Sequence, residues 1–232
     1  MRAFTLLGAS LILAGCGGVQ IAPTPELPRA LIEPIAAKVG LVVAEDMRNY
    51  THTETRGGVQ WVVQLGAGHQ KLVNALLNAG FREVIEFASL DAARAADGLQ
   101  AIFEPRVEQY SFATARDTGG DYVAATIRYR IGVHAADGQL VDTLTLTGYG
   151  YSLAGGMSSS APIEMASRLA MRDAAAKFLT QFPQQPVAKA LIRGEALVAK
   201  AGAAGAAALG SQVVDIAAVP IVKSRRRTTG GT

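Results

Sequence analysis

Cysteine occurs only once among the 232 residues, at Cys16. No disulfide can therefore form within the chain, and the packing of a core must stabilise the fold. Half of the residues are hydrophobic, which is enough to form the buried core of one domain with extensions at its ends.

A general excess of basic charge is also missing, although the isoelectric point of about 9.1 suggests one. Five basic residues lie near the two ends of the chain: Arg2, Lys223, Arg225, Arg226 and Arg227. Without them, seventeen Lys and Arg remain against nineteen Asp and Glu. A basic groove is the footprint of a nucleic-acid-binding protein, so this charge distribution predicts no nucleic-acid partner.

Patterns that carry catalysis or metal binding are scarce as well. No metal-ligand or catalytic-triad spacing joins His52, His69 and His134, so we expect these three histidines at ordinary polar positions. The glycines of residues 66–68 lack the rest of a phosphate-loop motif and favour a strand-to-helix turn. The serines of residues 158–160 have no nucleophile-elbow context. The sequence therefore predicts no enzyme, no cofactor and no metal site.

What the sequence does have is a distinctive N-terminus. Met1 and Arg2 give a positive end, and residues 3–13 form an apolar stretch that is too short to span a bilayer. This order is typical of an export signal peptide. The stretch closes in LAGC, with Cys16 as the last residue, and there it resembles the lipobox of bacterial lipoproteins. The resemblance implies a signal peptide over residues 1–15 and a diacylglycerol group on the sulfur of Cys16.

Lipidation gives the single thiol a physical role as a membrane anchor. Each buried methylene contributes about 0.8 kcal/mol, so two or more acyl chains, such as palmitate, hold a protein stably on a bilayer. In lipobox proteins an aspartate after the cysteine favours the inner membrane, but Gly17 occupies that position here. We therefore expect a lipid-anchored protein on the periplasmic face of the outer membrane.

The remaining chain divides into three parts by composition. Residues 16–37 carry four of the nine prolines among small and polar residues, which is typical of a tether. Residues 38–183 are expected to form a periplasmic domain. Residues 184–232 are expected to form a helical or flexible tail that is rich in Ala and Gly and has a basic end.

Short apolar or alternating runs predict strands in the domain. The first two runs are expected to pair as a hairpin, with NYTHTETRGG between them as a loop or an irregular connection. The last two runs are joined by the tight-turn sequence AADG and predict a long antiparallel hairpin with one apolar face. The predicted strands cover residues 39–43, 59–65, 81–87, 99–112, 122–134 and 139–151.

Helical periodicity marks two further segments. The stretch SLDAARAADG adds a short helical turn, with Ser89 or Asp91 as its cap. The fold class is therefore α+β: a mostly antiparallel sheet of about five strands, with two helices packed on one face. The residues predicted to line the apolar faces of the two helices are Leu72, Val73, Leu76 and Leu77, and then Ile163, Ala166, Ala170, Ala174, Phe178 and Phe182.

A lipobox, a tether and a domain with this order of elements resemble the small outer-membrane lipoproteins of Gram-negative bacteria. These include the lipopolysaccharide-assembly and YajG-like types. The resemblance implies a periplasmic interaction module with an envelope protein as partner. It carries over no binding residue.

The C-terminal tail leaves two functions open. Residues 201–222 contain a single charge, Asp215, and their length suits a transmembrane helix, but Ala-Gly composition, Asp215 and Pro220 oppose insertion. The expected function is a non-catalytic, outer-membrane-anchored periplasmic lipoprotein that acts as an interaction or assembly module of the cell envelope. The alternative is a subunit of an oligomeric outer-membrane export conduit with a membrane-inserted C-terminal segment.

Overall fold

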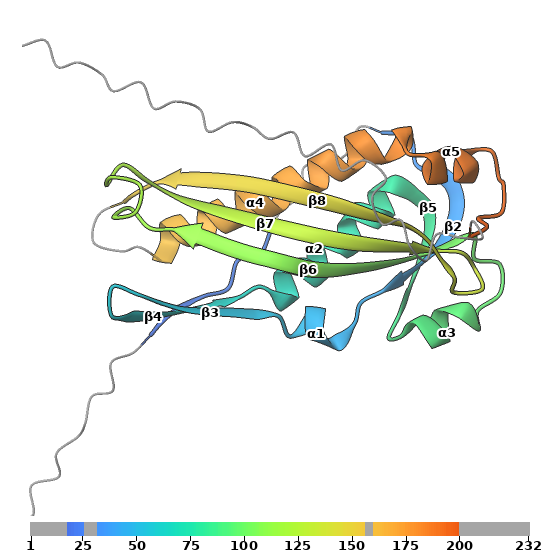
Figure 1. Ribbon diagram of the computed structural model, residues 1–232. Coiled ribbons are helices and arrows are strands. Elements are labelled where there is room, and N and C mark those ends of the chain that lie inside the picture. The colour runs from blue at the N-terminus through green and yellow to red at the C-terminus, as the bar shows by residue number, and fades with distance from the viewer. Residues whose placement is uncertain (1–17, 26–31, 156–159, 200–232) are drawn as a thin grey trace, which may run out of the picture. The chain divides into compact units, whose positions relative to one another are not determined.

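The computed structural model describes residues 18–25, 32–155 and 160–199 (Figure 1). The predicted signal peptide, Cys16 and residues 201–222 lie outside the described residues. In chain order the elements are β1 (Val19–Ile21), β2 (Ile35–Val42), α1 (Glu45–Arg48), β3 (Thr51–Arg56), β4 (Val59–Gln64), α2 (Gly66–Gly80), β5 (Phe81–Phe87), α3 (Leu90–Arg94), β6 (Ala101–Ala113), β7 (Tyr122–His134), β8 (Leu140–Leu153), α4 (Ser160–Gln181), the 3₁₀ helix η1 (Phe182–Gln184) and α5 (Pro186–Ile192).

The fold is α+β, as predicted, and its main sheet has five strands in the order β5-β2-β6-β7-β8. Strands β6, β7 and β8 pair antiparallel, whereas β2 runs parallel to both of its neighbours, β5 and β6. A parallel pair needs a long crossover connection, and the chain from β3 through α2 supplies it between β2 and β5. The main sheet is therefore mixed.

A second sheet of three strands, in the order β1-β4-β3, corrects the predicted first hairpin. Residues 39–43 and 59–65 do not pair with each other, because NYTHTETRGG supplies the regular strand β3 as the partner of β4. Gly57 and Gly58 close that hairpin with φ angles of 57° and 78°, a conformation that favours glycine.

The ordered domain differs at both ends from the predicted boundaries. Part of the predicted tether forms β1, which lies parallel to β4 and buries Ile21. Its three residues gain main-chain partners on a strand edge that would otherwise be open. Beyond residue 183, α5 buries Val187, Ala188 and Leu191 against the core, so part of the predicted tail belongs to the domain.

One face of the main sheet is covered and forms the core. Helices α2 and α4 contact each other on this face, and the small sheet lies beside α4 (Figure 1). The apolar stripe predicted for α4 is buried, and a cluster of phenylalanines continues the core toward η1. The residues of that cluster are Phe81, Phe103, Phe178 and Phe182.

The opposite face of the main sheet is covered only in part. Short helix α3 packs on it, with Ala93 buried against Val42, Leu99 and Ile102 in a second, smaller cluster. The cap of α3 is Ser89, whose hydroxyl oxygen accepts a hydrogen bond from the backbone N–H of Ala92 at 3.2 Å. Away from α3, the outward side chains of β6, β7 and β8 face solvent.

Candidate interaction surface

The open face is the outward surface of β6, β7 and β8. Along β7 the side chains alternate, and the inward ones are buried as the sequence predicted. The outward ones include Tyr122, Arg128 and Arg130, which are exposed. The buried set consists of Val123, Ala125, Ile127, Tyr129, Ile131 and Val133.

Two arginines at the middle of the open face have no partner among the described residues. Arg130 pairs in register with Arg106 of β6, which is bound to Glu104 at 2.7 Å and to Asp46 at 3.8 Å. Arg128 and Arg130 are exposed and make no ion pair or hydrogen bond with any residue in the described ranges. Their two positive charges are therefore available to a ligand or partner.

A tyrosine patch lies next to these arginines, toward the end of β8. We define it as Tyr122, Tyr149, Tyr151 and Leu153. Tyr151 is 70% exposed and Leu153 is 77% exposed, and the rings of Tyr122 and Tyr151 meet edge-on with centroids 6.4 Å apart. Isolated exposed apolar residues are common on proteins, but a contiguous group marks a surface that contacts something else.

The sequence GYGY at residues 148–151 explains why these tyrosines face outward. A Cβ atom at Gly148 would lie 2.0 Å from the carbonyl oxygen of Ala170, and one at Gly150 would lie 2.0 Å from that of Ala166. Only glycine permits this close approach of α4 to β8. Strand alternation then places Tyr149 on the opposite, solvent-facing side. The sequence reasoning did not single out these tyrosines, although the alternation of glycine and tyrosine is a readable signal.

Helix α4 also binds the outer edge of β8. The ammonium group of Lys177 donates to the carbonyl oxygen of Thr147 at 2.8 Å, and the N–H of Tyr149 donates to a carboxylate oxygen of Asp173 at 2.9 Å. Lys177 and Asp173 form an ion pair at 2.7 Å, and Lys177 lies 5.2 Å from the ring centroid of Tyr149. These contacts fix the backbone from which Tyr149 projects.

The three histidines lie in separate environments. Nε2 of His52 lies 3.2 Å from a carboxylate oxygen of Glu54, and Nε2 of His134 lies 3.2 Å from one of Glu104. His69 and His134 are buried, which corrects the expectation of ordinary polar positions. Within the described ranges, no group of three or more His, Cys, Asp or Glu side chains has the arrangement of a metal site.

His69 is the most enclosed of these side chains. Its Nδ1 lies 2.7 Å from the hydroxyl oxygen of Tyr129, and its Nε2 is buried with no hydrogen-bond partner among the described residues. Burial lowers the pKa of His69 to about 3 and raises the pKa of Tyr129 well above its usual value. Both side chains are therefore neutral at physiological pH.

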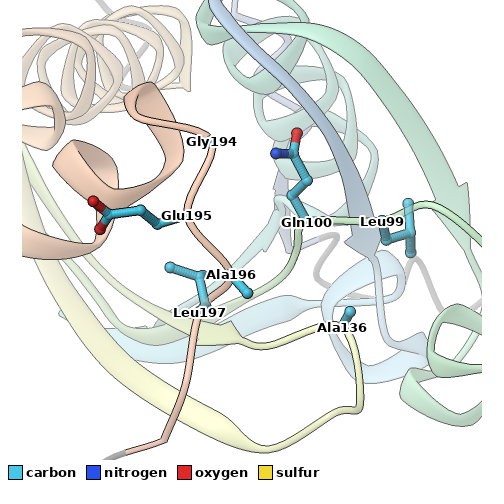
Figure 2. A pocket seen from close by; sticks show the side chains of 7 residues that line it. All are labelled: Leu99, Gln100, Ala136, Gly194, Glu195, Ala196 and Leu197. Atoms are coloured by element: carbon cyan, nitrogen blue, oxygen red, sulfur yellow. The ribbon is translucent and has the colours of Figure 1, made fainter.

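A hollow of about 180 Å³ lies between the β7–β8 turn and the segment that follows α5 (Figure 2). Its two polar side chains are already engaged: Gln100 accepts a hydrogen bond from the N–H of Lys38 at 3.2 Å, and Glu195 is bound by Arg193 at 2.7 Å. This hollow therefore lacks the convergent free polar groups of a catalytic centre. The lining residues are Leu99, Gln100, Ala136, Gly194, Glu195, Ala196 and Leu197.

In residues 18–25, 32–155 and 160–199, no helix combines the length and the apolar character needed to cross a bilayer.

Comparison with known proteins gives similarity to solved structures only. No protein-family model and no curated protein matches the chain. The minor lipoprotein from Acinetobacter baumannii shares 11% identity with a TM-score of 0.36, covering 65% of this chain and 94% of that one. Lipoprotein GNA1162 from Neisseria meningitidis shares 10% with a TM-score of 0.32, covering 64% and 99%. The PelC dodecamer from Paraburkholderia phytofirmans shares 15% with a TM-score of 0.31, covering 61% and 91%.

Proposed function

We propose that this chain is a non-catalytic lipoprotein of the bacterial cell envelope. Its lipid on Cys16 holds it at the periplasmic face of the outer membrane, and its domain binds an envelope protein through the open face. The lipobox supports the lipid anchor, and Gly17 supports the outer membrane as its location. The open face supports the binding role.

The observation that carries the binding role is the unpaired arginines Arg128 and Arg130 beside Tyr149. Tyr and Arg are enriched in protein interfaces and often supply much of the binding energy. Arg128 and Arg130 are exposed without an acidic partner in the described part of the chain, so an acidic surface complements them best. We therefore propose a protein partner with carboxylates facing this strand.

Site-specific photocrosslinking in living cells tests this function. Thr145 is exposed and pairs in register with Arg130, so a photoreactive amino acid at position 145 samples the open face. We expect a discrete adduct with an envelope protein. The charge-reversal pair Arg128→Glu and Arg130→Glu should weaken that adduct at least fivefold.

A matched control distinguishes the effect of changing the open face from the effect of changing the net charge. Lys71→Glu and Arg82→Glu change the net charge by the same amount at two exposed residues outside the open face, and this pair should leave the adduct unchanged. Equal adducts from both pairs would contradict the role of the arginines. An adduct of twice the chain's own mass would instead identify a second copy as the partner and favour the export-conduit alternative.

A further inference from the structure

The distance between the lipid anchor and the ordered domain is short. Cys16 precedes Val19, the first residue of β1, by three positions. Three residues of fully extended chain span at most about 11 Å. If Cys16 carries the lipid, as the proposed function states, the start of β1 is held within that distance of the anchor cysteine.

The start of β1 lies at one definite end of the domain. Val19 pairs with Trp61 of β4, two residues after β4 begins at the Gly57-Gly58 turn. That turn meets the β6–β7 connection, because Arg56 forms an ion pair with Asp117 at 2.8 Å. Strand β6 ends, β7 begins and β8 ends at this same end of the main sheet (Figure 1). We call it the anchor end.

Five of the ten exposed large apolar side chains among the described residues lie at the anchor end. Val59 is 41% exposed at the hairpin turn, and Met165 is 40% exposed in the first turns of α4. Tyr122, Tyr151 and Leu153 of the tyrosine patch complete the group. These residues come from four separate elements, so the fold, and not one apolar stretch of sequence, brings them together.

We propose that the anchor end lies against the phospholipid headgroups of the membrane that holds the lipid. Tyrosine is enriched at membrane interfaces, where its ring contacts acyl chains and its hydroxyl contacts water and headgroups. Arg116 in the β6–β7 connection is exposed and has no ion-pair partner among the described residues, so it suits a lipid phosphate. The long strands then point away from the membrane, and the arginines of the open face are turned sideways toward a partner.

Crosslinking to lipid tests the orientation with the full mature chain, beginning at Cys16. A benzoylphenylalanine replaces either Leu153 or Leu140, which are exposed leucines at opposite ends of β8. Each protein is placed in vesicles of phosphatidylethanolamine and phosphatidylglycerol at three to one, with tritiated lipid as the probe. We expect lipid labelling at position 153 to exceed that at position 140 at least fivefold.

Two preparations of the protein distinguish a failure of the proposed lipidation from a failure of the proposed orientation. One preparation is the protein as cells make it, and the other is unmodified protein coupled through the thiol of Cys16 to a maleimide lipid. Equal labelling at both positions in the coupled protein would overturn the membrane-facing anchor end. Cell-made protein that fails to float with vesicles would contradict only the proposed lipidation, and the coupled protein would still decide the orientation.

Discussion

His69 makes the stability of the domain sensitive to acid. In the folded protein its pKa is lowered to about 3 by burial, whereas in the unfolded chain it is near 6.5. Below pH 6.5 the unfolded chain therefore binds a proton that the folded protein does not, so stability falls as pH falls toward 3. Between pH 6.5 and 5 we expect a loss of about 2 kcal/mol from this residue.

Urea denaturation across this pH range measures the effect. His69→Gln should reduce the overall stability and also flatten its dependence on pH between 6.5 and 5. Asn78→Ala is the control, because it changes an exposed side chain of the same helix that does not titrate, and its pH profile should follow the wild type. A His69→Gln profile as steep as that of the wild type would show that other groups cause the acid sensitivity.

The burial of His69 also shows which properties of single residues the sequence alone does not predict. The alternation along β7 correctly predicted that Tyr129 points inward. His69 stands at the start of α2, where local sequence gives no sign of burial. Tyr129 is 60 residues away in the chain and contacts it only because the fold brings the first turn of α2 to the inward face of β7. Local periodicity contains no information about that contact.

At the scale of elements, the contact between β8 and α4 depends on the absence of side chains. A Cβ at Gly148 or Gly150 would overlap backbone atoms of α4, and backbone cannot move aside as a flexible side chain can. We expect Gly148→Ala or Gly150→Ala to cost about 1–3 kcal/mol in unfolding free energy. Gly155→Ala meets nothing within 4 Å and should be nearly neutral. Thermal or urea unfolding of the three variants compares them directly.

The same scale shows which elements could be predicted. The β7–β8 hairpin and the helices α2 and α4 follow local periods, and the sequence predicts all of them. Strand β1 has only three residues, and β3 has exposed threonines alternating with charged or imidazole side chains, so neither shows an apolar alternation. The alternation along residues 122–134 also predicts that Arg128 and Arg130 lie on the polar face of the sheet, where the structure has them. The tyrosines of β8 were missed, because their position beside these arginines depends on the register of β8 against β7.

For the whole molecule, the position of the C-terminal boundary can be measured by truncation. Removing residues 200–232 should leave the thermal midpoint nearly unchanged, because the core of the domain is formed by residues before 200. Removing residues 184–232 also deletes α5 and should cost about 3–6 kcal/mol, since Val187 and Leu191 are buried. Equal midpoints for the two truncations would show that α5 does not contribute to the core.

Membrane attachment of the whole molecule separates the two proposed functions. Cys16→Ser should abolish metabolic lipid labelling, because it removes the only thiol. If lipid is the only anchor, the full-length Cys16→Ser protein should leave the detergent phase and behave as a soluble monomer. If residues 201–222 insert in the bilayer, it should stay membrane-bound until residues 200–232 are removed. That second result, together with a large oligomer, would favour the export conduit.

The hydrogen bonds that α4 makes to β8 have a consequence for crowded membranes. Lipid anchoring confines neighbouring copies to two dimensions, where exposed strand edges collide often and can zip into continuous sheets. Lys177 occupies the carbonyl of Thr147, and Asp173 occupies the N–H of Tyr149, so an incoming strand finds these two positions already satisfied. If Cys16 carries the lipid as proposed, these two contacts oppose pairing of neighbouring copies through the middle of β8, and the open face stays available to a partner.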